Sequence, residues 1–255
     1  FGGNDGTYLF NIDGKSYSDF TPSLLLASAI FNFPINPIFK NKHMLQTIFK
    51  KDQLYNKEKT SNCESFLEGG YLKLTRKNGM LIFRLPKYKF RASNSDGLHI
   101  DVWQDGINWV RDAGSFSYAL DLNEQNQYSG TAGHSTIQFD NRNQMPRMSR
   151  FLFADSLKLK LIEKDFSNFT MSSAYQDHKN NYHLRSIKKF DNGWIIDDTV
   201  KGVYKTATLR FLLCPGEWIQ NNKEFRLGST KIEINSSSDA DFKLKNGFES
   251  LFYMQ

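Results

Sequence analysis

Short runs of alternating apolar and polar residues, separated by turn residues, follow one another from Ser65 to the end of this 255-residue chain. They recur about every 8–12 residues with no helical period between them, which is typical of an antiparallel sandwich or barrel. Asn78-Gly79 and Asp105-Gly106 separate two pairs of these runs, and both dipeptides favour tight hairpin turns. The sequence therefore predicts a mainly β protein, a large antiparallel β-sandwich preceded by a short helical segment.

The same alternation sets the bounds of the individual strands. The predicted strands are Tyr71–Arg76, Met80–Leu85, Leu98–Trp103, Ile107–Asp112, Ser135–Asp140, Lys158–Glu163, Tyr182–Phe190, Gly193–Asp198, Thr206–Leu213, Glu224–Leu227, Lys231–Ile234, Phe242–Lys245 and Ser250–Met254. Because the last strand stops at the final residue and the first residue is not Met, we expect a piece of a longer protein.

The start of the chain has a different pattern. Thr21 is a helix-capping residue type, a proline follows it at the first helical position, and an apolar run continues to Phe33. A second helical period over residues 37–49 is followed by a polar linker. We therefore expect a helical segment with its linker over residues 1–62 and the β-sandwich over residues 63–255.

Composition narrows the classes of partner. The formal net charge is +6, which favours an anionic partner such as an acidic polysaccharide or a lipid surface. The lysines are scattered and form no dense basic block, so we expect no nucleic-acid-binding arm. No apolar run approaches the about 18 residues of a membrane span, and we expect none. The two cysteines lie outside any metal-type motif, and the compartment, periplasmic or cytoplasmic, stays open.

His99 lies on the predicted strand Leu98–Trp103. Alternation places it on the same face as Asp101 and Trp103, opposite the apolar residues of that strand. An imidazole, a carboxylate and an indole on one face can line a polar groove. The alternative is a half-buried strand whose histidine bonds a neighbour.

His134 lies in a run of small residues just before another predicted strand. Small neighbours allow a ligand or a backbone to approach closely, and imidazole suits a general base or a metal ligand. Asp112 follows an apolar strand and precedes Ala-Gly, where a carboxylate either caps the turn or binds a cation. Tyr118 and Tyr128 flank the predicted loop 121–127, and a tyrosine hydroxyl transfers protons where nearby cations lower its pKa.

Four linked motifs resemble the β-domain of the heparinase II/III-like family of polysaccharide lyases, in the branch found with bacterial surface-polysaccharide genes. They read D-x-L-H-x-D-x-W-x-x-G-x-N at residues 96–108, D-A-G-S-F-S-Y at 112–118, S-G-T-A-G-H-S-T at 129–136 and D-N-R-N-Q-M-P-R at 140–147. Residues 183–185 and 194–198 resemble a later pair of strands in the same domain.

The resemblance implies an N-terminal (α/α) toroid joined to a C-terminal antiparallel β-sandwich, of which this chain carries the second part. It also implies β-elimination of a uronate-containing polysaccharide, such as a glycosaminoglycan or alginate. In that case the catalytic Tyr and Asn/His pair comes from the toroid, and this chain alone is inactive. The alternative is a non-catalytic glycan-binding or scaffolding module on the same fold.

Carried over by motif, the family's zinc-binding His and Asp correspond to His134 and Asp112. The third zinc ligand, a histidine, falls on Asn94, which is a poor ligand for zinc. A structural zinc is therefore the one cofactor to consider. The expected catalytic residues are His134, His99 and Tyr118, and the expected substrate-binding residues are Asp96, Trp103, Tyr128 and Arg111.

Overall fold

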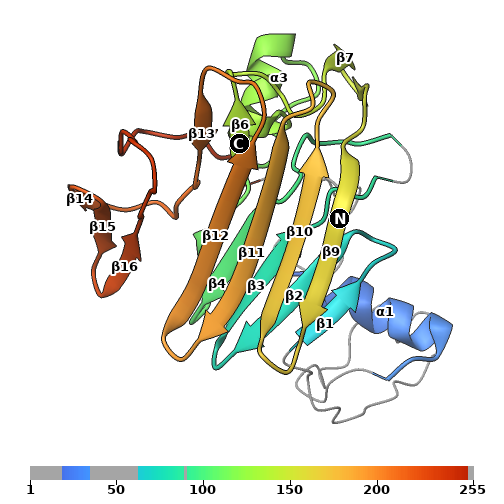
Figure 1. Ribbon diagram of the computed structural model, residues 1–255. Helices are drawn as coiled ribbons and strands as arrows, with labels where there is room; N and C mark the ends of the chain where they lie inside the picture. The colour runs from blue at the N-terminus through green and yellow to red at the C-terminus, as the bar shows by residue number, and fades with distance from the viewer. Residues whose placement is uncertain (1–18, 35–62, 89–90, 252–255) are drawn as a thin grey trace. The chain divides into compact units, whose positions relative to one another are not determined.

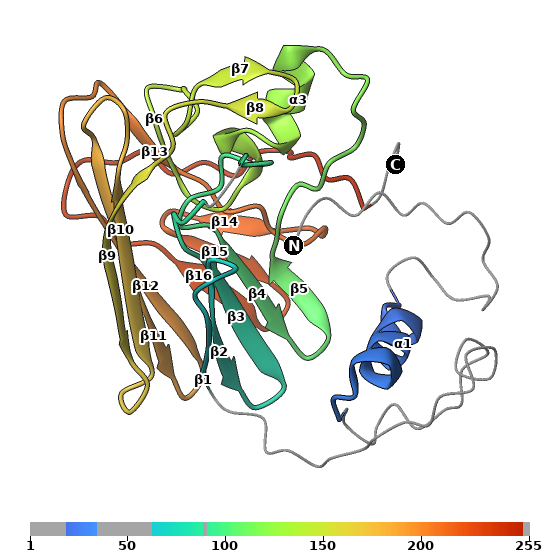
Figure 2. The same ribbon diagram turned by 90° about the vertical axis from the view of Figure 1, so that its right-hand side faces the viewer.

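Tight turns join short strands into two antiparallel sheets that face each other (Figures 1 and 2). The computed structural model describes residues 19–34, 63–88 and 91–251. Its chain divides into two compact units, residues 4–62 in one and residues 63–255 with residues 1–3 in the other. The antiparallel sandwich expected from the sequence is confirmed in the larger unit. The origin of residues 1–62 in a toroid stays a prediction.

The first sheet is a simple meander, because each strand pairs with the next one along the chain. The turn between its last two strands has positive φ at both Asp105 (52°) and Gly106 (79°). That backbone matches the right-handed twist of the flanking strands. The five strands are β1 (Cys63–Phe66), β2 (Tyr71–Arg76), β3 (Gly79–Arg84), β4 (Ile100–Gln104) and β5 (Ile107–Val110).

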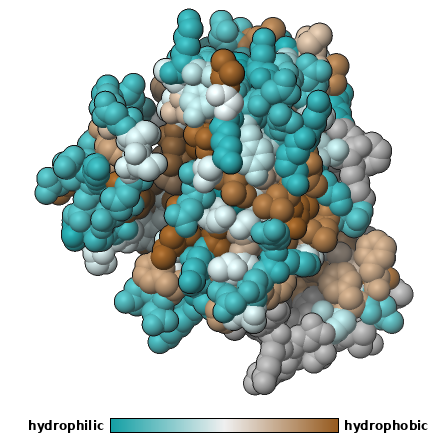
Figure 3. Space-filling view, viewed as in Figure 1, coloured by the Kyte–Doolittle hydropathy of each residue, from teal (hydrophilic) through white to brown (hydrophobic). Residues whose placement is uncertain are grey.

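The second sheet is also a meander, with four longer strands. Its outward face is mostly hydrophilic, with hydrophobic residues interspersed (Figure 3). On β11, Ile187 is buried whereas the neighbouring Lys188 is exposed, as alternation requires. The four strands are β9 (Lys158–Asp165), β10 (Thr170–Gln176), β11 (Tyr182–Phe190) and β12 (Gly193–Lys201).

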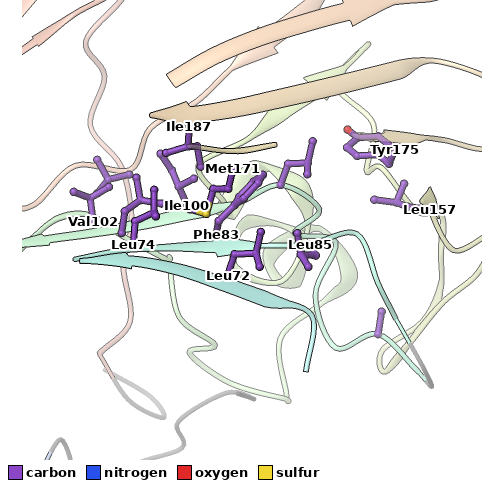
Figure 4. Close-up of a cluster of buried hydrophobic side chains, with 14 of the residues drawn as sticks. Leu72, Leu74, Phe83, Leu85, Ile100, Val102, Leu157, Met171, Tyr175 and Ile187 are labelled. Carbon is purple, nitrogen blue, oxygen red and sulfur yellow. The ribbon is translucent and has the colours of Figure 1, made fainter. Parts of the chain in front are cut away.

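The hydrophobic core lies between the two sheets (Figure 4). Full burial of one such aliphatic or aromatic side chain contributes roughly 1.5–3 kcal/mol, so this layer stabilises the sandwich. The core includes Leu72, Leu74, Leu81, Phe83, Ile100 and Val102 from the first sheet and Met171, Tyr175 and Ile187 from the second.

The residues that connect the two sheets gather at one end of the sandwich, at the top of Figure 1. Later strands return to them, because β13 pairs with β6 in a small sheet. A three-stranded sheet lies to one side, at the left of Figure 1. These elements are α3 (Leu122–Tyr128), the 3-10 helix η2 (Thr131–Gly133), β6 (Ile137–Phe139), β7 (Arg147–Ser149), β8 (Leu152–Phe153), β13 (Ala207–Leu209), β14 (Ile219–Asn221), β15 (Glu224–Leu227) and β16 (Thr230–Glu233).

A buried arginine joins the second sheet to this end of the sandwich. Arg185 on β11 has no exposed surface, and its Nε and Nη2 donate to the two carboxylate oxygens of Asp198 at 2.7 and 2.9 Å. Its Nη1 donates to the carbonyl oxygens of Leu98 and Ser135, both at 2.7 Å. His183 Nε2 also contacts Asp198, at 2.7 Å. The guanidinium therefore fixes two connecting loops against β11.

The smaller unit includes α1 (Thr21–Phe31), an 11-residue helix. The prediction that Thr21 caps it is wrong, because Phe20 holds the N-cap position and no side chain caps the helix there. The helix ends before the predicted Phe33, because Asn32 adopts a left-handed conformation with φ of 61°. The expected second helix over residues 37–49 and the linker after it lie outside the described residues.

Three predicted strands agree with the structure at both ends, namely β2, β11 and β15. The prediction of a strand at Phe242–Lys245 is wrong. There the side-chain amide of Gln220 bonds the backbone, accepting from Leu244 N at 2.9 Å and donating to Phe242 O at 2.8 Å. Of the last predicted strand, residues 250 and 251 are irregular and the rest lies outside the described part of the chain.

Replacing the buried guanidinium should destabilise the fold strongly. We expect Arg185→Met to lower the free energy of unfolding by about 3–5 kcal/mol, because it leaves the carboxylate of Asp198 buried without its partner. Urea denaturation followed by tryptophan fluorescence measures this. Lys188→Ala, three residues along the same strand but exposed, is the control and should leave the midpoint unchanged. Equal midpoints for the two variants would contradict the role given to Arg185.

Candidate functional site

His134 follows the single turn of η2 and is almost fully buried, with 1% of its surface exposed. The small residues before it allow this turn to pack on the end of α3. A Cβ atom on Gly133 would lie 2.2 Å from the carbonyl oxygen of Tyr128, so only glycine fits there. The small residues predicted a close approach of a ligand or a backbone, and the structure shows the backbone of η2 against the end of α3. This contact sets the position of the His134 imidazole.

Asp112 follows β5 and faces His134. Its Oδ2 lies 2.8 Å from His134 Nδ1, and its Oδ1 accepts from the backbone N–H of Gly114 at 2.6 Å. The Asp112 side chain is 36% exposed, so the pair meets the surface on the carboxylate side. Burial lowers the pKa of His134, but the charge and hydrogen bond of Asp112 outweigh it, and the net shift is upward. Burial likewise raises the pKa of Asp112, but His134 outweighs that effect and lowers it.

His99 completes the cluster. Its ring meets that of His134 edge to face, with centroids 5.5 Å apart. His99, Asp112 and His134 offer ligand atoms that all lie within 4.8 Å of one another. The backbone N–H of Ser135 donates to His99 Nδ1 at 2.9 Å. Burial lowers the pKa of His99 to about 4, so the ring is neutral at pH 7 and carries its proton on Nε2.

His99 thus supplies a second imidazole beside Asp112 and His134. The motif-based correspondence put the third zinc ligand at Asn94, and that assignment stays a prediction. His99 was expected as a catalytic residue but not as a member of the metal-ligand set, because the folded chain brings residues 99, 112 and 134 together from three separate loops. The alternation expected on β4 holds, since Ile100 and Val102 are buried and Asp101 is half-buried.

A buried amide holds two of these loops together. The side chain of Gln144 accepts from Gly97 N at 2.8 Å and donates to Gly97 O at 3.0 Å, which is a reciprocal pair. It also lies 3.3 Å from the hydroxyl of Thr136. Thr131 donates to the backbone oxygen of Ser95 at 3.0 Å. Gln144 was not predicted as a site residue, although it belongs to the D-N-R-N-Q-M-P-R motif.

Two expected substrate-binding residues are engaged in internal contacts. Arg111 Nη1 donates to Glu249 at 2.6 Å, and its other donors bond the backbone oxygen of Asn108. Asp96 accepts from the hydroxyl of Tyr88 at 2.8 Å and from Arg84 at 3.4 Å. These contacts show that both side chains stabilise the folded structure. Their role in substrate binding stays a prediction.

The aromatic candidates lie in different places. Tyr118, 41% exposed in the loop before α3, meets Phe151 edge to face at 5.6 Å between ring centroids. Tyr128 ends α3 and stacks on Phe116 at 5.5 Å. Trp103 is half-buried on β4. The geometric cluster therefore contains His99, Asp112 and His134, and the roles of the three aromatic residues stay predictions.

The low pKa of His99 predicts how the free energy of unfolding depends on pH. The pKa is about 4 in the folded protein and about 6.5 in the unfolded chain, so only the unfolded chain is protonated between these values. The contribution of His99 to the free energy of unfolding is complete above pH 6.5. It is lost as the pH falls toward 4, by roughly 1 kcal/mol per pH unit. His99→Gln should flatten this slope in denaturation curves. An NMR titration midpoint of His99 near 6.5 would refute the assignment.

A family model described as "Heparinase II/III-like, C-terminal" matches residues 58–247. A mutant of the heparan sulfate lyase HepC from Pedobacter heparinus shares the fold with a TM-score of 0.67 and 18% identity, over 93% of this chain and 38% of that one. A heparinase III with methylated lysines has a TM-score of 0.59 and 20% identity over 83% of this chain and 32% of that one. A further heparinase III structure has a TM-score of 0.59 and 16% identity, over 83% of this chain and 33% of that one.

This chain thus spans about a third of the length of these solved structures. A search among curated proteins found no match. In the described residues, no helix is long and apolar enough to cross a membrane. The match of the family model covers most of the chain and coincides with the sandwich and its cluster. The chain belongs to the heparinase II/III-like family and carries the C-terminal domain of that family.

Proposed function

We propose that this chain is the β-sandwich part of a polysaccharide lyase that cleaves a uronate-containing glycan by β-elimination. Family membership supports the lyase context. The observation that carries the proposal is the cluster of His99, Asp112 and His134, whose ligand atoms gather within 4.8 Å at one end of the sandwich. The names of the similar solved structures favour a glycosaminoglycan as the substrate class.

The proposed reaction has three chemical requirements. A base removes the proton from C5 of the uronate, and the electrons of that bond form the C4–C5 double bond as the bond from C4 to the glycosidic oxygen breaks. An acid then protonates the leaving oxygen. The uronate carboxylate must be neutralised, since otherwise the negative charge that develops at C5 is poorly stabilised.

The cluster can supply part of the third requirement. The raised pKa of His134 and the lowered pKa of Asp112 favour an imidazolium–carboxylate pair, which carries no net charge. The neutral His99 offers an Nε2–H as a donor, because its Nδ1 already accepts from Ser135. A donor of this kind can hold a carboxylate oxygen of the substrate. The three side chains by themselves therefore bind and orient a uronate but add no positive charge.

A zinc ion fits this group of side chains. Two imidazoles and a carboxylate are ligands that zinc prefers, and the ligand atoms of the three side chains lie within 4.8 Å of one another. We propose His99, Asp112 and His134 as the residues that hold it. His134 would bind through Nε2 in its neutral form, and His99 would bind through Nε2 after its proton moves to Nδ1, which would replace the bond from Ser135 N–H. Bound there, zinc would supply positive charge beside the uronate and fix the three loops.

In this proposal, some of the groups that transfer protons come from this chain. The others come from a helical toroid elsewhere in a longer protein. The resemblance assigns a Tyr and an Asn/His to that toroid. Tyr118 is the candidate that this chain offers, since its loop follows Asp112 directly and its ring is partly exposed. The site would then be complete where the toroid meets this end of the sandwich.

A non-catalytic glycan-binding module is the alternative. The reason for it in the sequence was Asn94 at the position of the third zinc ligand. The imidazole of His99 beside Asp112 and His134 supports the lyase against this alternative. The lyase remains the function that the geometry supports best.

The full-length protein should release unsaturated uronate from a glycosaminoglycan, or from alginate, as seen by ultraviolet absorbance of the new double bond. We expect His134→Ala to lower this rate by about 10²-fold or more, because the group that orients the uronate is lost. Lys188→Ala, exposed on the outer face of β11, is the matched control. If no uronate polymer gives unsaturated product, the lyase proposal fails and the binding module takes its place.

Metal content tests the zinc proposal without reference to activity. Protein produced with zinc should contain about one zinc ion per chain by atomic emission, since three ligands converge on one point. Asp112→Asn and His134→Ala should each lose it. His178→Ala, a histidine outside the cluster, should keep it. Zinc content that is the same in the wild type and in His134→Ala would rule out this site.

A further inference from the structure

A second polar site lies next to the cluster, in a pocket of about 300 Å³. That volume is at the lower end of the roughly 300–1,000 Å³ of ligand sites. The pocket is formed by α3, η2, β6 and the loop after β6. Its lining consists of four asparagines, two glutamines, Arg142 and Ala132, so no carboxylate lines it.

Gln138 on β6 is the most informative of these side chains. The residue is only 5% exposed, and its backbone pairs with Thr208 on β13. Its side chain lines the pocket, yet no group in the described part of the chain hydrogen-bonds to the amide. The amide therefore faces the pocket, where a ligand can take up its hydrogen bonds.

Asn126 on α3 presents a second amide in a fixed orientation. Its Oδ1 accepts from Asn143 Nδ2 at 2.9 Å and from Arg147 Nε at 2.7 Å. Asn143 is held in turn, because its Oδ1 accepts from the backbone N–H of Thr131 at 3.0 Å. With its oxygen engaged twice, Asn126 is left with its NH₂ group to donate. Such support from neighbouring side chains keeps a binding group in position before the ligand arrives.

The helix α3 extends this surface. Asn123, Asn126 and Gln127 have spacings of three and four residues, which places them on one face of the helix. Asn123 and Gln127 are exposed and form the rim of the pocket. The short helix α3 thus contributes three of the amides. Its polar side chains line the pocket and do not pack in the core.

The chemistry of the lining selects a class of ligand. Each amide offers both a donor and an acceptor, as neighbouring hydroxyl groups of a sugar ring do. Divalent cations prefer carboxylates, which the lining lacks. The charge of Arg142 is balanced by the buried Asp177 at 2.6 Å, although its Nη1 keeps an unmet donor in the described part of the chain. We infer that this pocket binds one saccharide unit through its hydroxyl groups.

The pocket is close to the cluster along the chain. Ala132 lines it and His134 comes two residues later, so their Cα atoms are at most about 7 Å apart. Binding at this pocket does not depend on the elimination reaction, and it would hold even in a non-catalytic module. In a lyase it would position a glycan next to the cluster.

Ligand-observed NMR on the protein, with cellobiose, glucuronate and acetate as probes, tests the inference. Both sugars should give saturation-transfer signals, whereas acetate should not. We expect Gln138→Leu, which keeps the packing volume but removes the amide, to weaken sugar binding about 3–10-fold, the factor of one neutral hydrogen bond. Gln127→Ala should have a similar effect at an exposed position where folding is not at risk.

Asn192→Ala, an exposed amide in the turn between β11 and β12, is the control and should leave sugar binding unchanged. Absence of sugar signals would overturn the inference. So would acetate binding as tightly as glucuronate, or sugar binding that neither Gln138→Leu nor Gln127→Ala weakens. Release of unsaturated uronate is measured separately, so failure of the lyase proposal and failure of the sugar pocket can be told apart.

Discussion

The buried guanidinium of Arg185 is the interaction on which both the sandwich and the cluster depend. A charge without exposed surface is stable in a protein only when its hydrogen bonds are fully met. Asp198 meets two of them, and the carbonyl oxygens of Leu98 and Ser135 meet two more. Burial alone would raise the pKa of Asp198, but Arg185 and His183 hold it well below its usual range. The carboxylate of Asp198 therefore stays charged at neutral pH and into the acid range.

The two carbonyl groups also explain how the sandwich positions the cluster. Leu98 precedes His99 and Ser135 follows His134, so one guanidinium fixes the backbone next to both imidazoles. The backbone N–H of Ser135 then bonds the ring of His99 directly. Gln144 adds a second set of bonds between the same two loops. Side-chain hydrogen bonds thus hold the two loops that carry His99 and His134.

Sequence reasoning succeeded where local chemistry decides the structure, as at Asp105-Gly106, whose turn needs positive φ. It missed β10 because Ser172 and Ser173 interrupt the apolar pattern, although Ser173 is buried and bonds Leu161 O at 2.8 Å. It also missed α3, whose polar sequence has no apolar period. The capping box of Asp121 and Glu124 was the available signal for that helix.

The cluster itself was only partly predictable, and the reason is spatial. His134 and Asp112 followed from their motifs, whereas the place of His99 beside them depends on loops that Arg185 and Gln144 bring together from distant positions. Once the three meet, their protonation states constrain one another. Asp112 stabilises the charged form of His134, and that charge together with burial keeps His99 neutral. A cation that binds these three side chains would displace the proton of His134, and a uronate would bring the negative charge that such a cation balances.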